Sequence, residues 1–116
     1  MAQLSTLGGI ERFDMPMFHF RYEVRPKQTH PQFGEYSGAM ASCWILRDTL
    51  ADAESVARGW IADEDWRITE TEFVGEITRE TQQPDGLRYF EQAEIDREVF
   101  VFYTWPVGAP DDTNAA

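Results

Sequence analysis

Residues 17–26 read Met-Phe-His-Phe-Arg-Tyr-Glu-Val-Arg-Pro, and this stretch decides the fold class. Every second residue from Phe18 to Val24 is apolar, and the residues between them are polar. A period of two is typical of a β-strand that has one face on a core and the other in solvent. Proline cannot donate a ladder hydrogen bond, so we expect the strand to end at Pro26.

A loop and a second strand follow. Residues 27–38 contain proline, glycine and serine, which favour turns. Residues 39–46 are apolar except for Ser42, which is typical of a strand that is covered on both faces. We therefore expect this strand to be central in a sheet.

The segment after Thr49 has the spacing of a helix. Thr49, followed three residues later by an aspartate, resembles a capping box, and apolar residues then recur at i, i+3, i+4, i+7 and i+8 from Ala53 to Ile61. This pattern predicts a helix over residues 51–64 that lies on a core. Gly59 within it costs about 1 kcal/mol relative to alanine, so we expect its missing side chain to permit close packing against the sheet.

The second half of the chain leaves two assignments open. Residues 66–78 predict a strand whose alternation breaks, so either a bulge lies near residues 70–73 or the stretch divides into two strands. Residues 87–96 fit a short helix or a strand, and we favour the helix. Residues 98–105 are apolar on both faces and predict another central strand, closed by Pro106.

These elements follow one another in the order β-β-α-β-α-β. They predict an α+β domain with a mostly antiparallel sheet of four to five strands and two helices on one face. The ferredoxin-like sandwich, or a variant of it, is the nearest common architecture, although the opening hairpin departs from its βαββαβ order. We expect a single domain over residues 15–106, between flexible tails at 1–14 and 107–116.

Composition restricts the classes of partner. The 116 residues include 10 basic and 21 acidic ones, which gives a formal net charge of −11. Phosphate backbones would be repelled, so we expect no nucleic acid partner. No apolar run is long enough to span a bilayer, so we expect no membrane partner. A single cysteine excludes an intrachain disulfide and favours the cytoplasm.

Four short motifs resemble those of a known group of proteins. They read Tyr-Ser-Gly-Ala-Met-Ala-Ser-Cys-Trp-Ile at 36–45, Gly-Trp at 59–60, Tyr-Phe-Glu-Gln-Ala at 89–93 and Tyr-Thr-Trp-Pro at 103–106. In these motifs the chain resembles a group of small uncharacterised bacterial α+β proteins. That group has no assigned activity, so the resemblance implies no catalytic residue.

The polar side of the first strand is the main candidate site. His19, Arg21, Glu23 and Arg25 alternate along it, and side chains two residues apart project together. Arginine can bind a carboxylate or phosphate and histidine can change charge near neutral pH, so this row and His30 form the candidate ligand-binding set. The alternative is a solvated polar face. The two histidines lack a metal-binding spacing, and we expect no metal and no cofactor.

Other reactive side chains have simpler explanations. Cys43 lies in an apolar strand, which favours a buried, inert thiol over a nucleophile. Glu70, Glu72 and Glu76 follow the acidic residues 63–65 and could pair for acid-base work or magnesium, but clustered carboxylates are usually only solvated. We therefore assign no catalytic residue and favour a protein that is not an enzyme.

Tryptophans are the candidate interface residues. Tryptophan combines a large apolar body with one hydrogen-bond donor and is enriched in protein interfaces. We select Trp44, Trp66 and Trp105 for this role, and we expect at least two of the four tryptophans to be plain core.

Three functions remain open. The leading one is a non-enzymatic interaction domain that self-associates, because small open sheets expose an edge or a face that a second chain can cover. The second is a small enzyme or ligand-binding protein that uses the polar face around His19, Arg21 and Glu23. The third is an acidic inhibitor of a basic partner protein, which rests on net charge alone.

Overall fold

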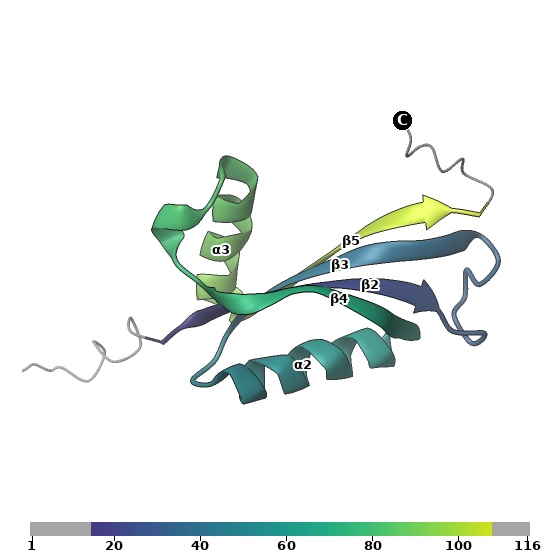
Figure 1. The fold of residues 1–116 in the computed structure, drawn as a ribbon, viewed down its shortest axis with the longest axis horizontal. Helices are drawn as coiled ribbons and strands as arrows, with labels where there is room; N and C mark the ends of the chain where they lie inside the picture. The colour runs from purple at the N-terminus through teal and green to yellow at the C-terminus, as the bar shows by residue number, and fades with distance from the viewer. Residues whose placement is uncertain (1–14, 108–116) are drawn as a thin grey trace, which may run out of the picture.

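The computed structural model describes residues 15–107, so the tails expected at 1–14 and 107–116 lie outside it apart from Val107. Four strands form one antiparallel sheet in the order β4-β2-β3-β5 (Figure 1). The strand bounds are β2 Met17–Pro26, β3 Tyr36–Leu46, β4 Trp66–Ile77 and β5 Glu98–Pro106. The helices are α2 Leu50–Asp63 and α3 Pro84–Asp96, with a 3-10 turn at Arg79–Thr81 before α3.

The α+β class, the antiparallel sheet and the order β-β-α-β-α-β are confirmed, and the fold is a variant of the ferredoxin-like sandwich. The expectation that both helices share one face is wrong. Helix α2 packs on the face that carries Cys43, and α3 packs on the face that carries Trp44 (Figure 1). The reason lies in β3, whose two faces are both apolar, so each face needs a cover of its own.

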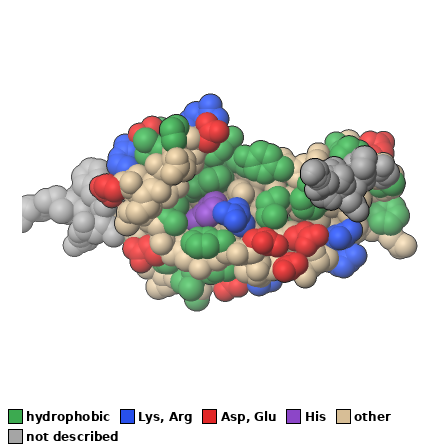
Figure 2. Space-filling model, turned by 45° about the horizontal axis from the view of Figure 1, so that its top comes forward, with side chains coloured by type: hydrophobic (Ala, Val, Ile, Leu, Met, Phe, Trp, Pro, Cys, Tyr) green, Lys and Arg blue, Asp and Glu red, His purple; other side chains and the backbone are tan. Residues whose placement is uncertain are grey.

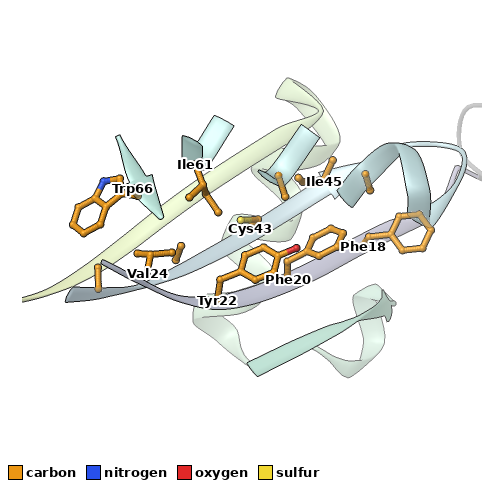
Figure 3. Close-up of a cluster of buried hydrophobic side chains, with 12 residues drawn as sticks. Phe18, Phe20, Tyr22, Val24, Cys43, Ile45, Ile61 and Trp66 are labelled. Atoms are coloured by element: carbon orange, nitrogen blue, oxygen red, sulfur yellow. The ribbon is translucent and has the colours of Figure 1, made fainter. Parts of the chain in front are cut away.

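The larger core lies between α2 and the sheet. The alternating apolar residues of β2 all point into it, as the sequence predicts, and they meet the small residues of β3 and of α2 (Figure 3). Phe20, Tyr22 and Val24 have no exposed surface. Ala53 and Ala57 let the helix backbone approach the sheet closely, and Ile61 fills the space toward Trp66.

Helix α2 begins where its cap predicts. The Thr49 side chain accepts a hydrogen bond from the Asp52 N–H at 3.1 Å, which satisfies one free donor of the first turn. The role expected for Gly59 is wrong, because this residue is exposed and a Cβ there would meet nothing within 4 Å. The glycine faces away from the sheet, and the alanines do the close packing instead.

Strand β4 settles the first open assignment. It is one strand of 12 residues, and its pairing with β2 shifts register between Arg21 and Tyr22 and again between Glu23 and Val24. The bulge alternative is therefore confirmed. The register shifts twist the strand, and most of its side chains are exposed in the part of the chain that the structure describes.

The second open assignment was residues 87–96, which could be a helix or a strand. The favoured helix is confirmed as α3, and it begins at Pro84, earlier than expected. Proline suits the first turn because a backbone N–H at this position has no acceptor within the helix, so the N–H that proline lacks is not missed. The helix ends at Asp96, and its C-cap residue Arg97 has a φ of 77°. Phe90 and Ala93 of α3 pack with Met17 and Trp44 in a second, smaller core.

Strand β5 is an edge strand, which corrects the expectation of a central one. Its apolar residues are explained by the two helices, because Phe100 and Phe102 pack toward α2 while Val99 and Val101 pack toward α3. Apolarity on both faces therefore reports the layers above and below a strand. It does not report whether the strand has a neighbour on each side.

Candidate functional site

One face of the sheet is only half covered. Helix α3 covers the end of this face around Trp44, and the other end, near Tyr103 and Trp105, has no helix over it among residues 15–107. Figure 2 shows a histidine side chain beside a basic one in a hollow between hydrophobic side chains, with acidic side chains further along. We call this surface the half-covered face.

The polar row of β2 lies on this face. His19, Arg21, Glu23 and Arg25 alternate with the buried residues of β2, so the structure brings these four candidates together as expected. His30 does not join them. Its ring lies 4.6 Å from the ring of Trp66, which belongs to the α2 core, and its Nδ1 accepts a hydrogen bond from the Gln32 N–H.

The environment of His19 distinguishes it within the row. Its Nδ1 lies 2.9 Å from the Cys43 carbonyl oxygen, which can only accept a hydrogen bond, so this nitrogen carries the proton. Burial lowers the pKa of His19 below 6.5, the neighbouring Arg21 lowers it further, and the hydrogen bond to the carbonyl opposes both. The neutral imidazole therefore keeps its lone pair on Nε2.

Aromatic rings surround His19. Its ring centroid lies 4.6 Å from that of Trp44 and 5.6 Å from that of Phe73, and Trp44 in turn lies 4.8 Å from Tyr89 of α3. Sequence reasoning missed Phe73, Tyr89 and their neighbour Tyr103. Phe73 lies after a bulge that reverses its face, and α3 crosses the sheet in a direction that no local pattern records.

The other end of the row is charged. Arg25 donates to the Glu23 carboxylate at 3.3 Å and to the Ser37 carbonyl at 3.0 Å. Glu23, Glu70 and Glu72 each place a carboxylate oxygen within 4.8 Å of the others. This differs from the expected set, because Glu76 pairs with Phe18 and so lies on the opposite face. The cluster is largely exposed, which fits solvated carboxylates.

Cys43 lies on the α2 face and has no exposed surface, so the expected burial of this thiol is confirmed. Burial raises the pKa of its thiol to about 12, far above neutral pH. Because His19 projects from the opposite face, its imidazole reaches only the Cys43 backbone. A cysteine-histidine pair for nucleophilic chemistry is therefore not formed by these two residues.

The three candidate interface tryptophans have different surroundings. Trp44 and Trp66 are each 6% exposed and pack inside the two cores, so they leave little surface for a second chain. Trp105 is 39% exposed on the half-covered face, and Tyr103 beside it is 54% exposed. Of the three tryptophans, Trp105 therefore offers the contact surface.

A second recess lies below the sheet, between α2 and β4. It has a volume of about 270 Å³, and its lining includes Lys27, Arg58 and Arg67. Lys27 already donates to the Ala62 carbonyl at 3.4 Å, and Arg58 pairs with Glu54 at 2.9 Å. These contacts occupy two of the three cations with groups of the chain itself.

No protein-family model, curated protein or solved structure matches this chain. Within the described residues, neither helix is long and apolar enough to cross a membrane.

Proposed function

We propose that this protein is an interaction domain that self-associates by pairing the β5 strands of two copies. The observation that carries the proposal is the contrast between the two sheet edges. Residues 99–106 of β5 contain no charged side chain, whereas β4 carries Arg67 and three glutamates. An uncharged, apolar edge strand is a surface on which another strand can pair.

The β4 edge has the features with which proteins prevent such pairing. Its charged side chains and its two register shifts interrupt a continuous row of backbone donors and acceptors. The pairing of β5 with β3 is regular from Gly38 to Ile45. A regular ladder leaves β5 with a regular outer row of backbone groups.

That outer row can be assigned by alternation. The Arg97 carbonyl accepts from Leu46 and the Val107 N–H donates to Glu35, so odd-numbered residues of β5 bond inward. Since antiparallel ladders alternate, Phe100, Phe102 and Thr104 direct their N–H and C=O groups outward. Pro106 follows in the same phase and has no N–H, which ends the row.

A two-fold axis at Phe102 lets all the outward N–H and C=O groups of this row form hydrogen bonds with the second copy. Phe102 then pairs with Phe102 of the second copy, and Phe100 of each copy pairs with Thr104 of the other. On the half-covered face, Trp105 comes to lie beside Val99 of the second copy, where the α3 of that copy packs. This register covers the exposed rings of Tyr103 and Trp105.

Sedimentation equilibrium of Thr104→Pro tests the proposal. Proline removes only the outward N–H of an exposed residue, so the wild type is expected to be dimeric and the variant monomeric. The matched control is Glu76→Pro. Glu76 is exposed on the β4 edge, and the same alternation turns its N–H outward, so the control should remain dimeric.

Two outcomes would contradict the proposal. One is a wild-type protein that stays monomeric at its highest soluble concentration. The other is a dimer that Thr104→Pro leaves intact while the variant keeps its circular dichroism spectrum. An interface on the β4 edge would instead make Glu76→Pro the monomeric variant.

A further inference from the structure

The recess around His19 contains polar groups that the fold leaves without partners. The Trp44 side chain is 6% exposed, yet among the described residues its indole N–H has no hydrogen-bond partner. A buried donor without an acceptor costs about 1–3 kcal/mol. Trp44 is in ring contact with both His19 and Tyr89, so this buried donor lies next to the aromatic recess.

His19 supplies an acceptor to the same recess. Its Nδ1–H is used by the Cys43 carbonyl, and no residue in 15–107 hydrogen-bonds to its Nε2. A neutral imidazole held in this tautomer accepts a hydrogen bond at Nε2 from an O–H or N–H group. The backbone hydrogen bond also holds the ring in position before a ligand arrives.

Arg21 supplies the charge. In a chain with a net charge of −11, four arginines form ion pairs with carboxylates of the chain, whereas within the described residues Arg21 forms none. It projects beside His19 from the same strand and is exposed. An arginine that remains unpaired among so many carboxylates is available to an anion from solution.

The walls of the recess are flat and apolar. Phe73 lies on one side of the His19 ring and Trp44 on the other, and Tyr89 continues the aromatic surface from α3. Aromatic faces of this kind favour a planar apolar body by offset stacking. Figure 2 shows the histidine of this face in a hollow rather than on a flat surface.

We propose that this recess binds a small aromatic carboxylate that also carries a hydroxyl group. The carboxylate pairs with Arg21, the hydroxyl donates to His19 Nε2, and the ring stacks on the aromatic walls. The recess is built from β2, β3, β4 and α3 of a single chain, so this proposal is independent of self-association.

The test uses 4-hydroxybenzoate as the probe and follows the His19 ring and the Trp44 indole N–H by NMR. We expect both resonances to shift saturably. Two matched probes separate the contacts: 4-hydroxybenzamide lacks the charge, and benzoate lacks the hydroxyl group. Both should bind more weakly than 4-hydroxybenzoate.

Variants assign the contacts to residues. Arg21→Gln should weaken binding of 4-hydroxybenzoate by about tenfold or more and remove the advantage over the amide. His19→Gln should remove the advantage over benzoate. Arg67→Gln is the matched control, because Arg67 is also exposed and forms no ion pair within residues 15–107, and it should leave the affinity unchanged.

The proposal is overturned if 4-hydroxybenzoate shifts neither resonance, or if its affinity is the same in Arg21→Gln and in the wild type. Equal binding of the acid and the amide would also overturn it. Repeating the titration with Thr104→Pro distinguishes the two proposals, because a monomeric variant should still bind the probe.

Discussion

His19 and His30 are the only histidines of the chain, and their surroundings give them different properties. His19 is held by a backbone carbonyl between aromatic rings, whereas His30 accepts a hydrogen bond from a loop N–H at an exposed turn. Burial lowers the pKa of His19. This shift arises from the second layer of the fold, because α3 and Phe73 withdraw water from the His19 ring.

The lowered pKa predicts how stability depends on pH. Below 6.5 the unfolded chain protonates His19 while the folded chain resists it, so the unfolded state binds more protons. The stability contributed is therefore complete above 6.5 and is lost as the pH falls toward the lower folded pKa. We expect urea unfolding to show a larger loss across this window for the wild type than for His19→Gln.

Replacement of Tyr22 by phenylalanine is expected to stabilise the fold. Its side chain has no exposed surface, its hydroxyl has no partner among the described residues, and burial raises its pKa to about 12. Tyr22→Phe removes an unsatisfied donor and keeps the ring, over which the Arg58 guanidinium lies at 5.3 Å. We expect the free energy of unfolding to rise by about 1 kcal/mol.

The control for Tyr22 is Tyr36→Phe. The Tyr36 hydroxyl accepts a hydrogen bond from the Gln32 side chain at 3.4 Å, and its replacement should give no gain. Urea unfolding of both variants measures the difference. A loss of stability in Tyr22→Phe would show that its hydroxyl is satisfied in solution and would contradict the prediction.

At the scale of elements, two glycines have opposite roles although both lie inside regular structure. Gly59 is exposed on α2, and a Cβ there would meet nothing within 4 Å. A Cβ on Gly38 of β3 would lie 3.0 Å from the Val24 carbonyl oxygen and 3.0 Å from the Trp105 ring. The first glycine only weakens its helix, whereas the second permits two neighbours to approach.

Alanine substitutions should therefore change stability in opposite directions. Gly59→Ala is expected to raise the free energy of unfolding by about 1 kcal/mol, because alanine is the better helix former. Gly38→Ala is expected to lower it by about 1–3 kcal/mol, because the backbone oxygen cannot move aside without disturbing the ladder. Thermal and urea unfolding of the two variants check both signs, and a stabilised Gly38→Ala would contradict the close approach.

At the scale of the whole molecule, charge opposes self-association. Each copy carries a net charge of −11, while the proposed contact strand β5 has no charged side chain from 99 to 106. Association therefore increases repulsion between copies without adding ion pairs along the paired residues. Salt screens the repulsion and leaves the apolar and backbone contacts unchanged.

This predicts that added salt strengthens the dimer. Sedimentation at increasing sodium chloride concentration should show a falling dissociation constant, because at moderate ionic strength repulsion between charges more than about 10 Å apart is largely screened. The midpoint of thermal unfolding should also rise with protein concentration. An interface held by ion pairs would respond in the opposite sense, and weaker association in salt would contradict the prediction.

Parts of the fold with a strong local pattern were predictable. The alternation of β2 placed its buried residues correctly, and Thr49 with the stripe from Ala53 to Ile61 placed α2. The row from His19 to Arg25 was predictable for the same reason, since its spacing along one strand fixes its face. His30 lies in a loop, where no period relates its direction to that of the strand.

By itself the sequence determined β2 with its polar row, β3 and α2, because helical and strand periods are local and are written in neighbouring residues. Only the tertiary structure decided that α3 covers the second face, that β5 is an edge and that Phe73 and Tyr89 join His19. These relations depend on contacts between segments far apart in the chain, and on a bulge that reverses the side on which later residues of β4 lie.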